Sequence, residues 1–156
     1  MKMCQVWSYM RKYKNQYKNI VNFQEKAYRD KLMQFAIRIV KLKNYLNEQK
    51  HEYNIANQIQ RPGTAIGANH REACNAVSTA EFVNKLAIAQ KEANETIYWL
   101  KVLYGSTLIS KVQYEDLQSG AEELYKIFTA SIKTAKDKTH YVLDGCSAWW
   151  EGVERP

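Results

Sequence analysis

Apolar side chains recur at alternating intervals of three and four residues over about residues 25–48, and this spacing constrains the fold more than any other feature. The positions are Leu32, Phe35, Ile39, Leu42 and Leu46. Such spacing places them on one stripe of an α-helix and is typical of a helix that packs in a bundle. Only six Gly and two Pro occur in 156 residues, which favours long helices over a many-stranded fold.

Two later segments, residues 79–104 and 111–138, repeat this spacing. Their apolar stripes consist of Phe82, Leu86, Ala89, Ala93, Leu100 and Leu103, and of Tyr114, Leu117, Ala121, Leu124, Phe128, Ser131 and Ala135. Ser78 and Ser110 each stand three residues before a Glu or Gln, which predicts a capping box at both helix starts. Gly105 is expected to end the helix 79–104 in the left-handed conformation.

A further helical segment, residues 52–77, is rich in small residues that let helix backbones approach closely. They are Ala56, Gly63, Ala65, Gly67, Ala68, Ala73 and Ala76. Pro62 lies in its middle and removes a backbone donor, so we expect a kink or a break there. The sequence therefore predicts an all-α protein, an antiparallel up-down-up-down four-helix bundle with a kinked second helix.

We expect three parts along the chain. Residues 1–22 form a basic and aromatic N-terminal extension, for which a short amphipathic helix is one alternative, and residues 23–138 form the bundle. Residues 139–156, with Trp149 and Trp150 between two Gly, form a C-terminal tail that packs on the bundle or on a partner.

The formal net charge of +7 is unevenly distributed. Residues 1–61 hold 13 Lys and Arg against 4 Asp and Glu, whereas residues 62–156 hold 10 against 12. A basic half suggests an acidic partner, of which nucleic acid is the commonest. The alternative is a solvated basic surface that keeps the protein soluble.

Other features of the composition bear on location. No stretch approaches the roughly 20 apolar residues of a membrane span, and no signal peptide is recognised, so no membrane partner is expected. Cys4, Cys74 and Cys146 lie far apart and form no CxxC pair, which fits a reducing cytoplasm.

The sequence offers no support for catalysis, and we expect neither an enzyme nor a cofactor or metal. A di-iron bundle needs Glu-x-x-His on two helices, and only Glu48 and His51 have that spacing. His70 is isolated, and no phosphate-binding loop or nucleophile elbow occurs.

Two sets of polar residues are candidates for function or structure. Cations on the first helix suit phosphate contact, although a plain solvated helix face is the alternative. Arg61 and Arg71 of the second helix face a central channel or a ligand; the alternative is that Arg71 fixes helix register with Asn69 and Glu72. The second set fixes helix register through hydrogen bonds or ion pairs. The candidate nucleic-acid-binding residues are Lys31, Arg38, Lys41, Arg61 and Arg71, and the structural polar residues are Asn69, Glu72, Glu92 and Glu95.

Two runs of sequence resemble a known family, the bacterial 23S ribosomal RNA intervening-sequence proteins. The run from Phe35 to Leu42 resembles their first-helix motif, and the run from Gln58 to Asn69 resembles their signature Q-x-x-R-S-G-T-S-I-G-A-N. The match continues through the run Lys91 to Thr96 and covers roughly residues 20–136. Pro62 and Ala65 depart from the family, which usually has Ser at both places.

The resemblance implies an up-down-up-down bundle that assembles as a ring-shaped homopentamer. A related branch resembles the accessory subunit of diversity-generating retroelements, which binds a reverse transcriptase and nucleic acid. Our hypothesis is a non-catalytic oligomeric bundle that binds RNA, DNA or a ribonucleoprotein through a basic surface. The alternative is a protein-binding scaffold, such as a reverse-transcriptase accessory subunit, whose basic charge is incidental.

Overall fold

Four helices account for the described chain. The computed structural model describes the backbone of residues 3–143 and the side chains of residues 27–136. The helices are α1 (Met3–Lys50), α2 (Asn54–Cys74), α3 (Thr79–Gly105) and α4 (Lys111–Leu143), and no strand lies between residues 3 and 143. The predicted all-α fold with four helices is confirmed. By internal contacts the chain divides into two compact units, Met1–Gln34 and Phe35–Pro156.

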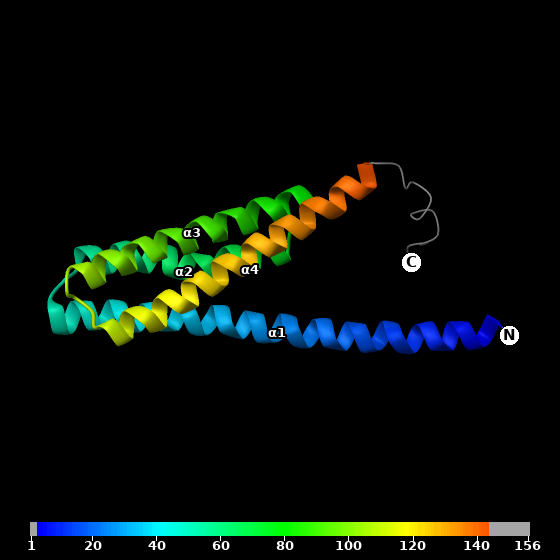
Figure 1. Cartoon of the computed structure of the whole chain (residues 1–156), viewed down its shortest axis with the longest axis horizontal. Coiled ribbons are helices and arrows are strands. Elements are labelled where there is room, and N and C mark those ends of the chain that lie inside the picture. The colour runs from blue at the N-terminus through cyan, green and yellow to red at the C-terminus, as the bar shows by residue number, and fades with distance from the viewer. Residues whose placement is uncertain (1–2, 144–156) are drawn as a thin grey trace. The chain divides into compact units, whose positions relative to one another are not determined.

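The second unit is the bundle itself. Connections of three to five residues join the end of α1 to α2, α2 to α3, and α3 to α4, so consecutive helices turn back on one another. α3 packs against both α2 and α4, and Figure 1 shows neighbouring helices running in opposite directions. The stretch of α1 from residue 35 onward meets α2 at Gly63 and α4 at Gly120.

The core of this unit consists of the predicted apolar stripes. Along each stripe the central side chains are buried, whereas Phe82, Tyr114, Ser131 and Ala135 at the ends are half-buried. Each fully buried large apolar side chain contributes about 1.5–3 kcal/mol, so the stripes supply most of the driving force for folding. The largest fully buried apolar side chains are Ile39, Leu46, Ile59, Ile66, Leu86, Leu100, Leu103, Leu124 and Phe128.

α1 and α2 approach closely at Gly63, as its small size suggests. A Cβ atom on Gly63 would lie 2.7 and 2.8 Å from the two γ-carbons of Ile39, closer than real Cβ atoms come to other atoms. Ile39 is fully buried, so its side chain has little space into which it can move. The close packing of these two helices therefore depends on the absence of a side chain at Gly63.

Of the kink or break expected at Pro62, the break does not occur, because α2 is continuous from Asn54 to Cys74. A proline inside a helix costs about 3 kcal/mol through one missing hydrogen bond and a clash. Pro62 is itself buried in the bundle, and the Thr64 hydroxyl donates to the Gln60 carbonyl at 2.8 Å. Burial of the segment on both sides of the proline offsets this cost. A bend in the helix axis stays a prediction.

Both predicted helix starts are observed, with one difference in detail. Ser110 and Gln113 form a reciprocal box: the Gln113 N–H donates to Ser110 Oγ (3.3 Å), and the Ser110 N–H donates to Gln113 Oε1 (2.9 Å). At α3 the Glu81 N–H donates to Ser78 Oγ (3.1 Å), but the Glu81 carboxylate accepts from Val77 instead of Ser78.

The third helix ends one residue later than predicted, and its left-handed residue lies two residues later. Gly105 is the last helical residue, and the left-handed residue is Thr107, with φ 57°. The Leu108 N–H donates to the Leu103 carbonyl and the Thr107 N–H to the Tyr104 carbonyl, both at 3.0 Å, which defines a Schellman motif with Thr107 at C′. Leu103 and Ile109 are both buried, and their packing determines which residue turns the chain. It outweighs the preference of glycine for the left-handed conformation.

The first and last helices are longer than predicted. α1 begins at Met3 and α4 ends at Leu143, so the expected boundaries at residues 22 and 138 fall within helices. Trp149 and Trp150 of the predicted tail lie outside the described residues.

We predict that Ser110→Ala lowers the free energy of unfolding by about 0.5–2 kcal/mol, because it removes the acceptor for an orphan helix N–H. Chemical denaturation of the variant measures this. Ser119→Ala, at an exposed position inside α4, is the control and leaves stability almost unchanged. Equal stabilities of the two variants would contradict the cap assignment.

Gly63→Ala is expected to destabilise the protein by about 1–3 kcal/mol, because the new methyl group overlaps Ile39. Ile39→Val removes one contacting methyl group, so the double variant is expected to be less destabilised than the sum of the single changes. Gly105→Ala is the matched control, since a Cβ there meets nothing within 4 Å. Denaturation of all four variants checks the coupling, and strict additivity would refute it.

Candidate nucleic-acid interface

Arg38 of α1 pairs with a carboxylate of the same bundle. Its guanidinium donates to Asp116 of α4, and the side chains of the two residues are 34% and 67% exposed. Gly120, one turn further along α4, leaves room for this arrangement, since a Cβ there would lie 3.4 Å from Arg38 Nη1. Arg38 is therefore held against α4. A ligand binds its guanidinium only alongside Asp116 or by displacing Asp116.

The other two candidate cations of α1 are exposed. Lys31 belongs to the first unit and Lys41 to the second. Tyr45, the aromatic neighbour of Lys41 on this face, is half-buried, and the Lys50 ammonium lies 5.9 Å from its ring centroid. Arg38 and Lys41 are three residues apart and so lie close together on the helix surface.

Arg61 and Arg71 are both exposed on α2. Neither forms an ion pair with another residue in the described part of the chain. Ten residues of helix separate them, which corresponds to about 15 Å along the axis. They are accessible to an acidic partner but do not form one cluster.

The polar residues proposed to fix helix register have different partners. Glu72 of α2 pairs with Lys85 of α3, and its hydrogen bond and negative charge raise the pKa of Lys85. Asn69 bonds within its own helix, where its side-chain amide donates to the Ala65 carbonyl at 2.9 Å. Glu95 accepts from the Trp99 indole N–H at 3.4 Å, also within one helix, whereas Glu92 is half-buried. Within residues 27–136, the side chain of Glu72 is thus the one among these four that pairs with another helix.

His70 is buried and contacts the aromatic core. Its ring centroid lies 6.3 Å from that of Phe128, and the Cys74 sulfur lies 3.8 Å from Nε2. Among residues 27–136 no group of three or more His, Cys, Asp or Glu side chains is arranged to hold a metal ion.

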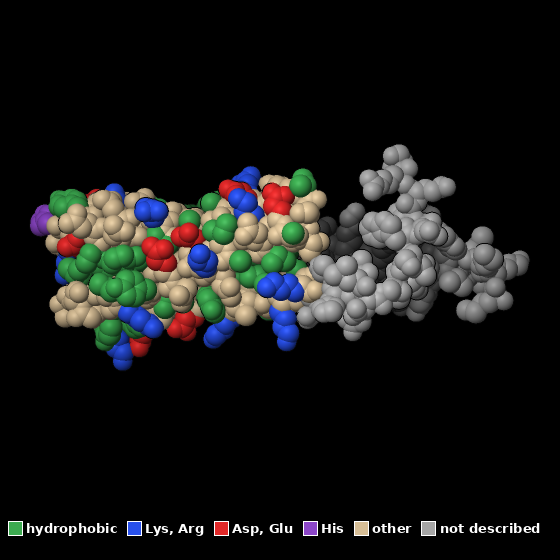
Figure 2. Space-filling model, turned by 90° about the horizontal axis from the view of Figure 1, so that it is seen from above, with side chains coloured by type: hydrophobic (Ala, Val, Ile, Leu, Met, Phe, Trp, Pro, Cys, Tyr) green, Lys and Arg blue, Asp and Glu red, His purple; other side chains and the backbone are tan. Residues whose placement is uncertain are grey.

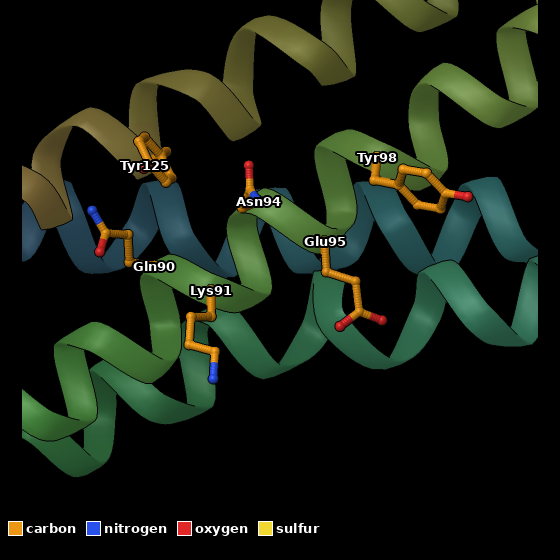
Figure 3. Close-up of a pocket in the computed structure, with 6 residues that line it drawn as sticks. All are labelled: Gln90, Lys91, Asn94, Glu95, Tyr98 and Tyr125. Carbon is orange, nitrogen blue, oxygen red and sulfur yellow. The ribbon is translucent and has the colours of Figure 1, made fainter.

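Sequence reasoning missed an open groove of about 450 Å³ between α3 and α4. Its lining residues are Gln90, Lys91, Asn94, Glu95 and Tyr98 from α3 and Tyr125 from α4, and Figure 3 shows them along the two helices. Tyr98 is 59% and Tyr125 is 37% exposed. The signal in the sequence was Tyr98 itself, which falls opposite the apolar stripe of residues 79–104 on a helical wheel.

The surface of the described residues carries both signs of charge. Figure 2 shows one face, on which Lys and Arg side chains alternate with Asp and Glu and hydrophobic groups gather between them. This face therefore has no uniform basic patch. No helix in the described part of the chain is long and apolar enough to cross a membrane.

The fold and its residues define a class: a small four-helix bundle that begins with a long basic helix. Residues 24–130 match the family of the 23S rRNA-intervening sequence protein, and the chain belongs to this family. A similar solved structure is a protein of unknown function from the S23 ribosomal protein family of Bacteroides thetaiotaomicron. It is 47% identical, with a TM-score of 0.67, over 67% of this chain and 97% of that chain. No curated protein matches the chain.

Proposed function

We propose that this protein is a non-catalytic, oligomeric bundle of the cytoplasm that binds RNA or a ribonucleoprotein through a basic surface. The charge of α1 is the observation that carries this proposal. Between Met3 and Lys50 the helix holds eleven Lys and Arg against three Asp and Glu, a surplus of eight positive charges on one element. A helix with such a surplus attracts phosphate groups and releases their counterions on binding.

The candidate cations differ in how available their charges are to a phosphate group. Lys31, Lys41, Arg61 and Arg71 are exposed, whereas Arg38 already has Asp116 as its partner. The names of the relatives agree with an RNA partner, since the family is named after an intervening sequence of 23S rRNA and the solved relative belongs to a family of ribosomal proteins. The bound RNA would thus be held mainly by charge, which positions a backbone without reading sequence.

We further propose that the protein assembles with itself, as a closed homopentamer. Ile37 and Val40 of α1 are 38% and 37% exposed although both are apolar. The apolar surface of α1 is therefore wider than the contacts within one chain require. A second copy that covers these side chains would remove them from water.

The exposed apolar residues of α1 also favour the second candidate, a protein-binding scaffold such as a reverse-transcriptase accessory subunit. In that case the same surface binds another protein, and the positive charge only solvates the helix. RNA binding through charge weakens steeply as salt rises, whereas a scaffold requires a particular protein partner.

Light scattering tests the assembly. We expect one species near 91 kDa, five times the 18.2 kDa chain, whose mass is insensitive to dilution in the micromolar range. Ile37→Glu with Val40→Glu should dissociate it, because burial of the introduced charges is costly. Lys101→Glu, at an exposed position of α3, is the control for a new surface charge. A mass near 18.2 kDa for the wild type would contradict the proposal.

Replacement of Lys31, Arg38 and Lys41 together by Gln is expected to weaken RNA binding and to flatten its salt dependence. Removal of one phosphate contact lowers the slope of log K against log salt by about 0.7 on single strands. Asp116→Asn is expected to act in the opposite direction and to raise affinity by about two- to fivefold, because it frees Arg38 from an exposed ion pair. Fluorescence anisotropy over a salt series measures both effects.

Glu115→Gln is the matched control for Asp116→Asn. Glu115 lies next to it on α4 and pairs with Lys111 of its own helix, 3.6 Å away, so this change should alter affinity less. If the wild type binds neither RNA nor DNA at low salt, the scaffold hypothesis replaces RNA binding. Equal salt slopes for the wild type and the triple variant would show that these three residues make no phosphate contacts.

A further inference from the structure

Two tyrosines line the groove between α3 and α4, and a second tyrosine pair joins the same two helices outside its lining. Tyr98 and Tyr125 line it, and Tyr104 of α3 stacks on Tyr114 of α4 with centroids 4.6 Å apart and an interplanar angle of 12°. Tyr98 leaves 59% of its surface in water, and Tyr104 leaves 40%. Two exposed tyrosine rings that line one groove offer flat, partly apolar faces on which a planar ligand can stack.

Hydrogen bonds and a ring contact link residues of the groove to their neighbours. The Trp99 indole donates to Glu95, and its ring meets Tyr98 edge-on, with centroids 5.2 Å apart at 73°. At the other end the Gln90 amide donates to Thr129 Oγ1 at 2.7 Å, and this hydroxyl donates to the Tyr125 carbonyl at 2.9 Å. α3 and α4 are thereby tied together where Tyr125 projects, so binding of a ligand costs little ordering at this end of the groove.

Asn94 supplies the polar group of the groove. It is exposed, and its carboxamide has no hydrogen-bond partner among the described residues. Figure 3 shows it between Gln90 and Tyr98 on α3, on the side that faces Tyr125 of α4. A free carboxamide offers one donor face and one acceptor face, the pair that the edge of an adenine complements.

Three exposed lysines lie in or beside the groove and can contact a phosphate. Lys91 lines the groove, Lys101 lies one turn beyond Tyr98, and Lys126 follows Tyr125. All three are exposed and form no ion pair within residues 27–136. One carboxylate also lines the groove: Glu95 accepts from the Trp99 indole at 3.4 Å and keeps its negative charge.

We propose that this groove binds unpaired bases of RNA. One base stacks on Tyr125 and a neighbouring base on Tyr98, the Asn94 carboxamide pairs with a base edge, and Lys91 meets the connecting phosphate. This inference rests on the proposed RNA binding and adds to it a site for single strands that lies apart from α1. Stacking of bases on tyrosine and hydrogen bonding to their edges is the usual way in which proteins recognise unpaired RNA.

The test compares three fluorescent 12-mers by anisotropy: oligoadenylate, the same sugar-phosphate chain without bases, and an RNA duplex. We expect the wild type to bind oligoadenylate more tightly than the abasic strand. Tyr125→Ala and Tyr98→Ala each weaken oligoadenylate binding by about 5- to 100-fold and leave the abasic strand unaffected. Asn94→Ala lowers affinity for oligoadenylate in the same selective way.

Two further variants separate stacking from other effects. Tyr125→Phe keeps the ring and should retain wild-type affinity, and Tyr53→Ala removes a tyrosine that is 55% exposed at the start of α2, outside the groove. Circular dichroism and thermal unfolding of each variant confirm that the bundle is intact. Since Tyr98 projects into solvent, its replacement keeps the test valid if Tyr125→Ala fails to fold.

Each remaining outcome overturns the inference. If the wild type binds RNA and both tyrosine variants bind oligoadenylate equally well, the groove is not a base site, whereas RNA binding through α1 stands. If the wild type binds none of the three probes, the proposed function and the groove site fail together. If Tyr125→Ala leaves RNA binding unchanged but alters the mass seen by light scattering, the groove is a protein interface.

Discussion

The contact between Ile39 of α1 and Gly63 of α2 is the constraint on which the bundle depends most directly. Ile39 is fully buried, and Gly63 leaves space for it that a single methyl group would fill. On α4, Gly120 gives similar room to Phe35, whose ring would lie 3.2 Å from a Cβ at that position. Residues 35–50 of α1 thus pack against α2 at Gly63 and against α4 at Gly120.

The sequence was sufficient to predict features that depend on neighbouring residues. Helical spacing identified the buried stripes, and the Ser110 box was predicted because its partners lie three residues apart. Features that depend on tertiary packing were missed. Pro62 does not break α2, because the bundle buries the segment around it. Thr107, not Gly105, takes the left-handed conformation, since the buried residues on both sides determine where the chain must turn.

The same distinction applies to the candidate site. Exposure of Lys41 was predictable from its place opposite the apolar stripe, whereas the exposure of Arg61 and Arg71 on α2 was not. The pairing of Arg38 with Asp116 was not, because 78 residues separate the two along the chain. The groove was missed for a related reason: Tyr98 and Tyr125 come from different helices, and only the antiparallel packing of α3 and α4 brings them to one surface.

The surplus of positive charge lies on α1 and the tyrosine groove on α3 and α4, and contacts to charge and to rings respond differently to salt. Phosphate contacts on α1 weaken as salt rises because counterion release becomes less favourable, whereas stacking of bases on tyrosine is almost unaffected. A duplex offers phosphates but no free base faces, and a short single strand offers both. An RNA with a helical stem and an unpaired segment therefore satisfies both proposed surfaces. In an oligomer each surface repeats in every subunit, so contacts that are weak singly add up when one RNA spans several copies.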